Sequence, residues 1–212
     1  MGKKRKKERT SLYSKFIKDQ ETVLGLDCSS NTIGWGIISV HDNHTMLVAH
    51  GHFKPLGSEF SELERLDHTY NKITELCETF RPNCVAVEDI FLFMKGKSRA
   101  QTITVLTAFN RVSSLAAYKS TKNVSFYSVH QIRKIIKHFC NIDETIPKDG
   151  MPDVIRKYLC ARFSNILNTR NNIAKETYDE ADGIAAAWAG VLHIMHPDRV
   201  ESLLEVKRKG KK

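Results

Sequence analysis

The sequence predicts an α/β domain: a five-stranded mixed sheet, formed by an antiparallel meander and then parallel strands, with helices on both faces. A continuous apolar run at residues 22–28 is typical of a strand buried on both faces. Two more strand-like segments follow after short turns, which makes a three-stranded meander. Beyond residue 61, helical and strand-like periodicities alternate, as they do in parallel β-α-β units.

The elements are expected in a definite order. Ser29–Thr32 forms the turn after the first strand, and Asp42–His44 the turn after the second. From Ser61, apolar residues recur at spacings of three and four, which indicates an amphipathic helix that ends before Pro82. The expected strands are residues 22–28, 34–40, 45–53, 83–88 and 124–129. The later helices are expected at 98–118, 130–139, 152–165 and 178–194, the last capped by Thr177 in a capping box with Glu180.

Basic residues concentrate at the two ends of the chain. Residues 1–18 carry eight Lys or Arg against one Glu, and residues 207–212 carry five Lys or Arg. The residues between them are slightly acidic, so the net charge of +9 belongs to the ends. We expect a basic tail at 1–19, one folded domain at 20–197 and a basic tail at 198–212. Such tails attract polyanions such as nucleic acid, and the alternative is a purely solubilising role.

The cysteines indicate the compartment. There are five, with no CxxC pair, which predicts a reducing, cytosolic environment and no zinc site. No secretory signal is visible, and the longest near-apolar run, 183–195, is too short to span a bilayer. We expect a cytoplasmic, DNA-associated protein without a membrane partner. A nuclear location stays open because Lys3–Lys7 resembles a localisation signal.

Four carboxylates stand at the edges of apolar segments. Asp27 closes the first strand, Glu88 closes the fourth, and Asp179 and Asp182 stand three apart at the start of the last helix. Polar residues at strand ends of such a sheet gather in one crevice. Clustered acids repel one another unless protons or cations neutralise them, and divalent metal ions that support phosphoryl transfer are the usual solution.

Each acid also has a structural explanation when taken alone. An Asp after a strand is most often a turn residue, and an Asp in the first turn of a helix interacts favourably with the helix dipole. The conjunction of four acids is what favours a metal site. Asp89 and Glu180 are rival ligands one residue away, and both are expected to point outward.

Three blocks of the chain resemble the signature blocks of RuvC-type Holliday junction resolvases, within the ribonuclease H-like superfamily. The blocks are Gly25–Gly36, Val85–Phe91 and Asp179–Ala185, and the resemblance covers about residues 20–196. It implies a ribonuclease H-like fold, a homodimer, two Mg²⁺ or Mn²⁺ ions and no small-molecule cofactor. It also implies paired nicks of a four-way DNA junction that leave 5′-phosphates. The longer basic ends hint at a phage, viral or otherwise divergent branch.

The resemblance assigns the site residues. Asp27 would bridge the two ions, with Glu88 and either Asp179 or Asp182 completing one site each. Arg133 and Lys148 match lysines that lie near the scissile phosphate, although arginine at 133 changes the geometry.

Further residues are expected to contact DNA. Phe91 matches an aromatic that wedges into the junction centre, and its alternative is a core phenylalanine. The nearby cations could equally be solvated surface residues. The cations expected to bind DNA are Lys95, Lys97, Arg99, Lys134 and Lys137.

Other function classes stay open at this point. A flap or RNA-processing nuclease would use the same metal site, since the site recognises phosphate and not branching. A sugar kinase or actin-like ATPase shares the Asp-x-x-Ser turn that begins at Asp27, but this chain has no Gly-Gly pair for its phosphate loops. A non-catalytic nucleic-acid-binding protein on a decayed nuclease fold should lack one of the acids, and none is missing.

Overall fold

The computed structural model describes residues 21–41, 44–90, 100–147, 149–159 and 175–205. Its strands are β1 (Glu21–Cys28), β2 (Ile33–His41), β3 (His44–Phe53), β4 (Cys84–Asp89) and β5 (Val124–Ser128). Its helices are α2 (Glu62–Phe80), α3 (Ala100–Thr121), α4 (Val129–Phe139), α5 (Met151–Tyr158), α7 (Lys175–Met195) and α8 (Pro197–Glu205).

The strands form one five-stranded sheet in the order β3-β2-β1-β4-β5. β1, β2 and β3 pair antiparallel as a meander. β4 and β5 extend the sheet on the other side of β1, and both run parallel to it. The predicted fold class, a mixed sheet covered by helices on both faces, is therefore confirmed.

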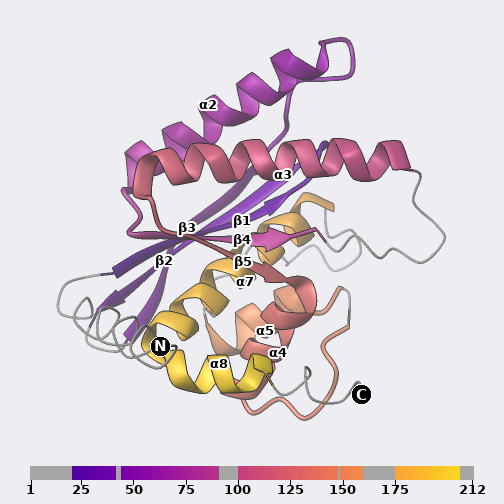
Figure 1. Ribbon diagram of the computed structural model, residues 1–212. Coiled ribbons are helices and arrows are strands. Elements are labelled where there is room, and N and C mark those ends of the chain that lie inside the picture. The colour runs from indigo at the N-terminus through magenta and orange to yellow at the C-terminus, as the bar shows by residue number, and fades with distance from the viewer. Residues whose placement is uncertain (1–20, 42–43, 91–99, 148, 160–174, 206–212) are drawn as a thin grey trace, which may run out of the picture.

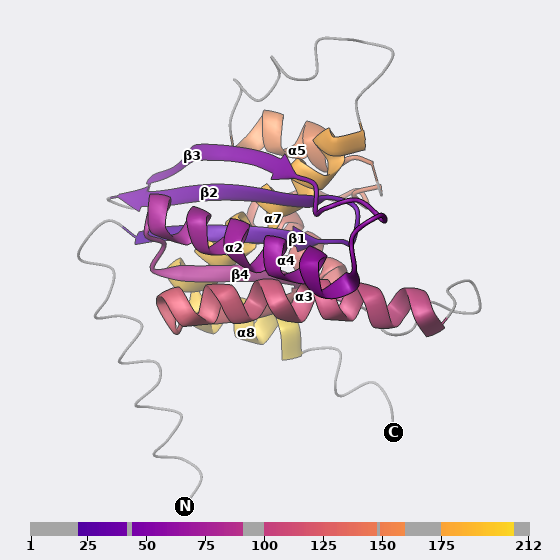
Figure 2. The same ribbon diagram turned by 90° about the horizontal axis from the view of Figure 1, so that it is seen from above.

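Helices cover the two faces of the sheet unequally (Figure 1). α2 and α3 lie side by side on one face, and Figure 2 shows them from above with the strands behind. α4, α5, α7 and α8 lie on the other face. Successive strand residues alternate between these layers. In β1, Val23 belongs to the core under α7, whereas Leu24 and Leu26 belong to the core under α2 and α3.

α7 packs directly on the middle of the sheet because glycines open a path for its backbone. A Cβ atom added at Gly25 would lie 2.1 Å from the carbonyl oxygen of Gly183, so no side chain fits there. Four alanines of α7, Ala185–Ala187 and Ala189, are buried in the same contact. α7 has 21 residues, yet neither it nor any other described helix is long and apolar enough to cross a bilayer.

Two expectations about the C-terminal part need correction. The basic tail was expected from residue 198, but α8 occupies Pro197–Glu205 and buries Val200 in the core, with Leu203 and Leu204 packed nearby. The folded domain therefore extends to at least Glu205. α7 begins at Lys175, so Thr177 lies inside the helix and is not its N-cap.

Candidate active site

Asp27 and Glu88 lie at the carboxyl ends of neighbouring parallel strands. β1 and β4 pair in register up to the residue before each acid. Val23 of β1 and Ala86 of β4 point into the core under α7. Asp27 follows Val23 by four residues, and Glu88 follows Ala86 by two. Because side chains alternate with a period of two, both carboxylates face the layer that contains α7.

α7 brings the other two acids to the same place. A Cβ atom on Gly34 would lie 1.8 Å from the carbonyl oxygen of Asp179, so the first turns of the helix rest on this glycine. Gly34 is the register partner of Asp27 in the β1–β2 ladder. Asp182 follows one helical turn later on the same side of α7 as Asp179. The helix acids therefore lie beside the end of β1.

The electrostatics of the carboxylates agree with one shared site. Burial raises the pKa of Asp27 well above its usual range, and the charges of the other three acids raise it further. Burial, and then the charge of Asp182, raise the pKa of Glu88 to about 8, while the positive charge of Arg133 opposes the shift. Such effects act over short distances, so Asp27 is near the other three acids, and Glu88 is near Asp182 and Arg133.

This group of acids suits hard divalent cations. Each side chain offers only carboxylate oxygens, which Mg²⁺ and Mn²⁺ prefer, and the mutual repulsion of the acids is what bound cations would relieve. Among the described residues, no three His, Cys, Asp or Glu side chains are already arranged as a metal site. The carboxylates are thus gathered but do not form a complete ligand set.

The two rival acids have other partners. Asp89 is on the opposite side of β4 from Glu88, where its carboxylate pairs with Arg111 of α3 at 3.3 Å. It points away from the acid cluster, as expected. Glu180 was expected to point outward, but its carboxylate contacts the Nδ1 atoms of His50 at 2.9 Å and His52 at 2.6 Å, both in β3.

The predicted basic residues are placed differently from one another. Arg133 is near Glu88, and its positive charge opposes the rise in the pKa of that acid. It lies in the second turn of α4, which begins directly after β5, the strand beside β4. Ser128 caps this helix, and its hydroxyl accepts from the N–H of Gln131 at 3.3 Å. Lys134 and Lys137 of the same helix donate to the carbonyls of Leu203 and Asp143. Phe91, Lys95, Lys97, Arg99 and Lys148 lie outside the described residues, and their roles stay predictions.

Two residues that support the site have no obvious signal in the sequence. Asn110 of α3 is buried, and its Nδ2 donates to the backbone carbonyl of Glu88 at 2.8 Å. Arg65 of α2 donates from its guanidinium to the carbonyls of Ser30, at 2.7 Å, and Leu56, at 2.8 Å. Asn110 thus fixes the end of β4, and Arg65 fixes the turn that follows Asp27. Both bind backbone carbonyls, whose position depends on the fold alone.

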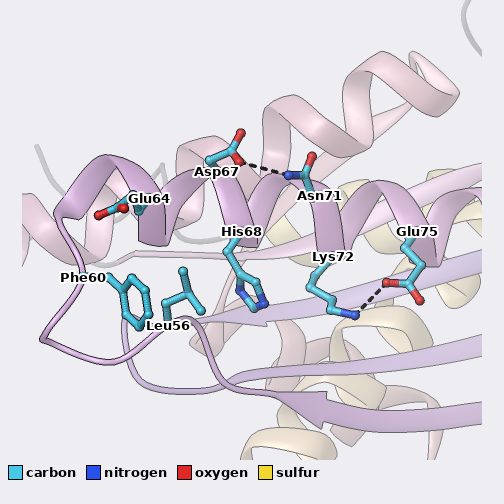
Figure 3. Close-up of a pocket in the computed structure, with 8 residues that line it drawn as sticks. All are labelled: Leu56, Phe60, Glu64, Asp67, His68, Asn71, Lys72 and Glu75. Atoms are coloured by element: carbon cyan, nitrogen blue, oxygen red, sulfur yellow. Dashed lines mark hydrogen bonds and ion pairs between the residues drawn. The ribbon is translucent and has the colours of Figure 1, made fainter.

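A separate pocket of about 470 Å³ lies along α2, away from the acid cluster. Figure 3 shows its lining: Leu56, Phe60, Glu64, Asp67, His68, Asn71, Lys72 and Glu75. None of the predicted site residues is among them. Its acids already have local partners, since Asp67 accepts from Asn71 at 3.1 Å and Glu75 pairs with Lys72 at 2.8 Å. We therefore assign no part of the reaction to this pocket.

Known proteins are similar to this chain in sequence and in fold. A family model described as crossover junction endodeoxyribonuclease RuvC matches residues 23–145. The chain is 25% identical over 171 residues to the RuvC of Rubrobacter xylanophilus, which covers 74% of this chain and 93% of the relative. It is 27% identical over 180 residues to the RuvC of Ehrlichia ruminantium, covering 81% and 97%. A structure of Thermus thermophilus RuvC in complex with Holliday junction substrate has a TM-score of 0.62 at 16% identity, covering 82% and 95%.

These comparisons decide between the function classes that the sequence left open. The structural likeness supports a ribonuclease H-like fold, and the family match gives no support to a sugar kinase or actin-like ATPase. The matched segment includes Asp27, Glu88 and Arg133, whereas Asp179 and Asp182 lie beyond it and are placed by the packing of α7. The match spans more than half of the chain, so this protein belongs to the RuvC family of crossover junction endodeoxyribonucleases, which are metal-dependent nucleases.

Proposed function

We propose that this chain resolves four-way DNA junctions by paired nicks that leave 5′-phosphates, using two Mg²⁺ ions held by Asp27, Glu88, Asp179 and Asp182. One observation carries the proposal beyond family membership. The strand acids face α7, and the backbone of Asp179 rests on Gly34, the register partner of Asp27. An arrangement of four converging carboxylates has its ordinary use in binding divalent cations for phosphodiester chemistry.

The protein's own groups prepare the site in two ways. Burial and mutual repulsion make a fully ionised cluster unfavourable, so Asp27 and Glu88 favour a proton or a bound cation. Arg133 adds positive charge beside Glu88, where a scissile phosphate would lie. When bound, two divalent ions supply Lewis acidity that lowers the pKa of an attacking water and stabilises the leaving 3′-oxygen. Mn²⁺ should substitute for Mg²⁺ because it accepts the same oxygen ligands.

Paired nicks require two active sites, and we propose a homodimer formed through α3 and β5. Leu115 and Tyr118 of α3 are 49% and 50% exposed and stand three residues apart on one helix face. Phe126 of the edge strand β5 is 41% exposed and lies 5.0 Å from the guanidinium of Arg111, which is one turn before Leu115. Exposed large apolar side chains gathered on one helix and the edge strand beside it favour association.

The oligomeric state tests this surface. Leu115→Glu should convert a dimer into a monomer in sedimentation equilibrium. The matched control is Leu63→Glu, because Leu63 is 78% exposed and belongs to the first turn of α2, outside the proposed α3–β5 surface. Equal masses for both variants and the unmodified protein would contradict the α3–β5 surface.

Substrate choice is tested by cleavage in Mg²⁺ of a four-way junction, a flap, a linear duplex and an RNA–DNA hybrid. We expect symmetric nicks in opposed strands of the junction and little cleavage of the other three substrates. Asp27→Asn provides the control for contaminating nucleases. Preferential cleavage of the flap or the hybrid would replace junction resolution with the corresponding nuclease activity on the same fold.

A further inference from the structure

Glu180 stands between two of the acids and faces a different direction. Successive residues of an α-helix are rotated by about 100°, so Glu180 cannot share the face occupied by Asp179 and Asp182. Its side chain is only 12% exposed and turns toward the edge strand β3. There His50 Nδ1 lies 2.9 Å from one carboxylate oxygen, and His52 Nδ1 lies 2.6 Å from the other.

The sheet explains why these three residues meet. His50 and His52 are two residues apart, so both side chains leave the same face of β3. They pair with Gly36 and Gly34 of β2, the glycines on which α7 rests. With no side chain at these glycines, α7 lies close to the sheet and Glu180 reaches across β2 to the histidines. Burial alone would raise the pKa of Glu180, but the two histidine contacts outweigh it and lower the pKa.

The glycine contacts leave one movement of the helix weakly restrained. At the first turns of α7 the contact is backbone against backbone, between Gly34 and Asp179, and it limits how close the helix approaches the sheet without fixing rotation about the helix axis. The side-chain contact of Ile184 with Gly36 comes more than one turn later. A side chain bonded at both of its oxygens to a neighbouring strand opposes such rotation. Rotation of the first turn would carry Asp179 and Asp182 away from Asp27 and Glu88.

We propose that Glu180, His50 and His52 are positioning residues that set the rotation of the first turns of α7, and thereby hold Asp179 and Asp182 in the metal site. This inference rests on the proposed function of the four acids. None of the three residues is assigned a contact with metal or DNA. Their effect passes through the two aspartates, in the way that outer residues orient metal ligands in other proteins.

Metal binding measured without catalysis is the direct test. Mn²⁺ titration by calorimetry should show that Glu180→Ala weakens binding by roughly 10- to 100-fold, the usual effect of removing a residue that orients a ligand. The Mg²⁺ concentration for half-maximal junction cleavage should rise by a similar factor, while the rate at saturating Mg²⁺ recovers to within a few-fold. Glu180→Gln keeps one acceptor oxygen and should recover part of the affinity.

Matched controls separate positioning from a general loss of charge or stability. Glu75→Ala removes one acid and one ion pair from α2, and His44→Ala removes an exposed histidine from β3. Both should bind Mn²⁺ as the unmodified protein does. Because the three residues act as a unit, His50→Ala combined with Glu180→Ala should be no worse than Glu180→Ala alone. If Glu180→Ala does not fold, His52→Ala removes one of the two contacts of Glu180 instead, and it should also weaken Mn²⁺ binding.

Asp27→Asn distinguishes the two levels of the argument, since it should abolish Mn²⁺ binding. If Asp27→Asn binds Mn²⁺ normally, the proposed metal site is wrong, and this inference fails with it. If Asp27→Asn loses binding but Glu180→Ala and His52→Ala keep normal affinity and only unfold at lower temperature, the metal site stands. The positioning role is then overturned.

Discussion

The four acids form two pairs that are held by different physical means. Asp27 and Glu88 belong to hydrogen-bonded strands, where register and alternation fix the direction of each side chain. Asp179 and Asp182 belong to a helix whose place depends on long-range packing against Gly34 and Gly25. The strand pair is therefore determined by the sheet itself, whereas the helix pair depends on everything that orients α7. A metal site divided in this way can be disturbed from one side while the other stays intact.

The largest expected effect is common to both pairs. Asp27→Asn, Glu88→Gln, Asp179→Asn and Asp182→Asn should each reduce junction cleavage in Mg²⁺ by several orders of magnitude, because all four acids contribute to one cluster of charge. Single-turnover rates and DNA binding in Ca²⁺ would be measured for each variant. Junction binding should survive. Near-normal cleavage by both helix variants would remove Asp179 and Asp182 from the site.

The next largest effect is expected from a change at the contact between the two pairs. Gly34→Ala would place its Cβ 1.8 Å from the carbonyl oxygen of Asp179, so α7 must shift away from β2. We expect a loss of about 3 kcal/mol in the free energy of unfolding, at the upper end for overpacking, because the obstacle is backbone. Urea denaturation measures this loss.

Gly57→Ala is the matched control, because the nearest atoms to its Cβ would be the end of the flexible Glu59 side chain. Its stability should change by less than about 0.5 kcal/mol. Equal stability of both variants would mean that α7 is free to adjust, and the helix pair would then not depend on the glycine contact.

A pH titration tests the environment of the strand pair. The pKa of Glu88 rises from 4.5 to about 8 in the folded protein, mainly through burial, so the folded state holds this proton where the unfolded chain has released it. Its contribution to stability is full below pH 4.5 and is lost as pH rises toward 8. Asp27 shifts in the same direction. Without metal, the melting temperature should therefore decrease as the pH rises from 4.5 to about 8.

The variant Glu88→Gln removes this titrating group and should flatten the curve measured in EDTA. Adding Mg²⁺ at pH 8 should raise the melting temperature of the unmodified protein, because the cation replaces the lost proton. Identical pH dependence for Glu88→Gln and the unmodified protein would show that Glu88 is not held in a buried, repulsive environment.

Sequence reasoning was most accurate where the information is local. Asp27 and Glu88 each end an apolar run, so short patterns suffice to predict that they lie at strand ends. Asp179 and Asp182 stand three apart in a helix, but their place beside β1 depends on the long-range packing of α7 on Gly34. Glu180 was expected to point outward, which was wrong. Its partner His50 is 130 residues away in the chain, and no local pattern connects the two residues. The C-terminal boundary was wrong because counting charges concealed the spacing of Val200, Leu203 and Leu204, which pack α8 against the core.

Asn110 is the clearest case of a residue that only the fold explains. It is 1% exposed, and its Nδ2 donates to the carbonyl of Glu88, whereas its Oδ1 has no hydrogen-bond partner among the described residues. Burying an amide with one unsatisfied atom costs free energy, so the stabilising contribution of Asn110 comes from its hydrogen bond to the carbonyl of Glu88. That bond connects α3 to the end of β4, on the opposite side of the sheet from α7.

The smallest predicted effect tests this connection. Asn110→Ala removes the buried side-chain donor to the carbonyl of Glu88, so the free energy of unfolding should fall by about 1–3 kcal/mol. Cleavage in Mg²⁺ should decline only a few-fold, since the β4 ladder still sets the direction of Glu88. The control is Asn71→Ala, which removes an exposed amide bonded to Asp67 at 3.1 Å on α2. If Asn110→Ala instead reduced cleavage as strongly as Glu88→Gln, the strand pair would depend on side-chain support as much as the helix pair does.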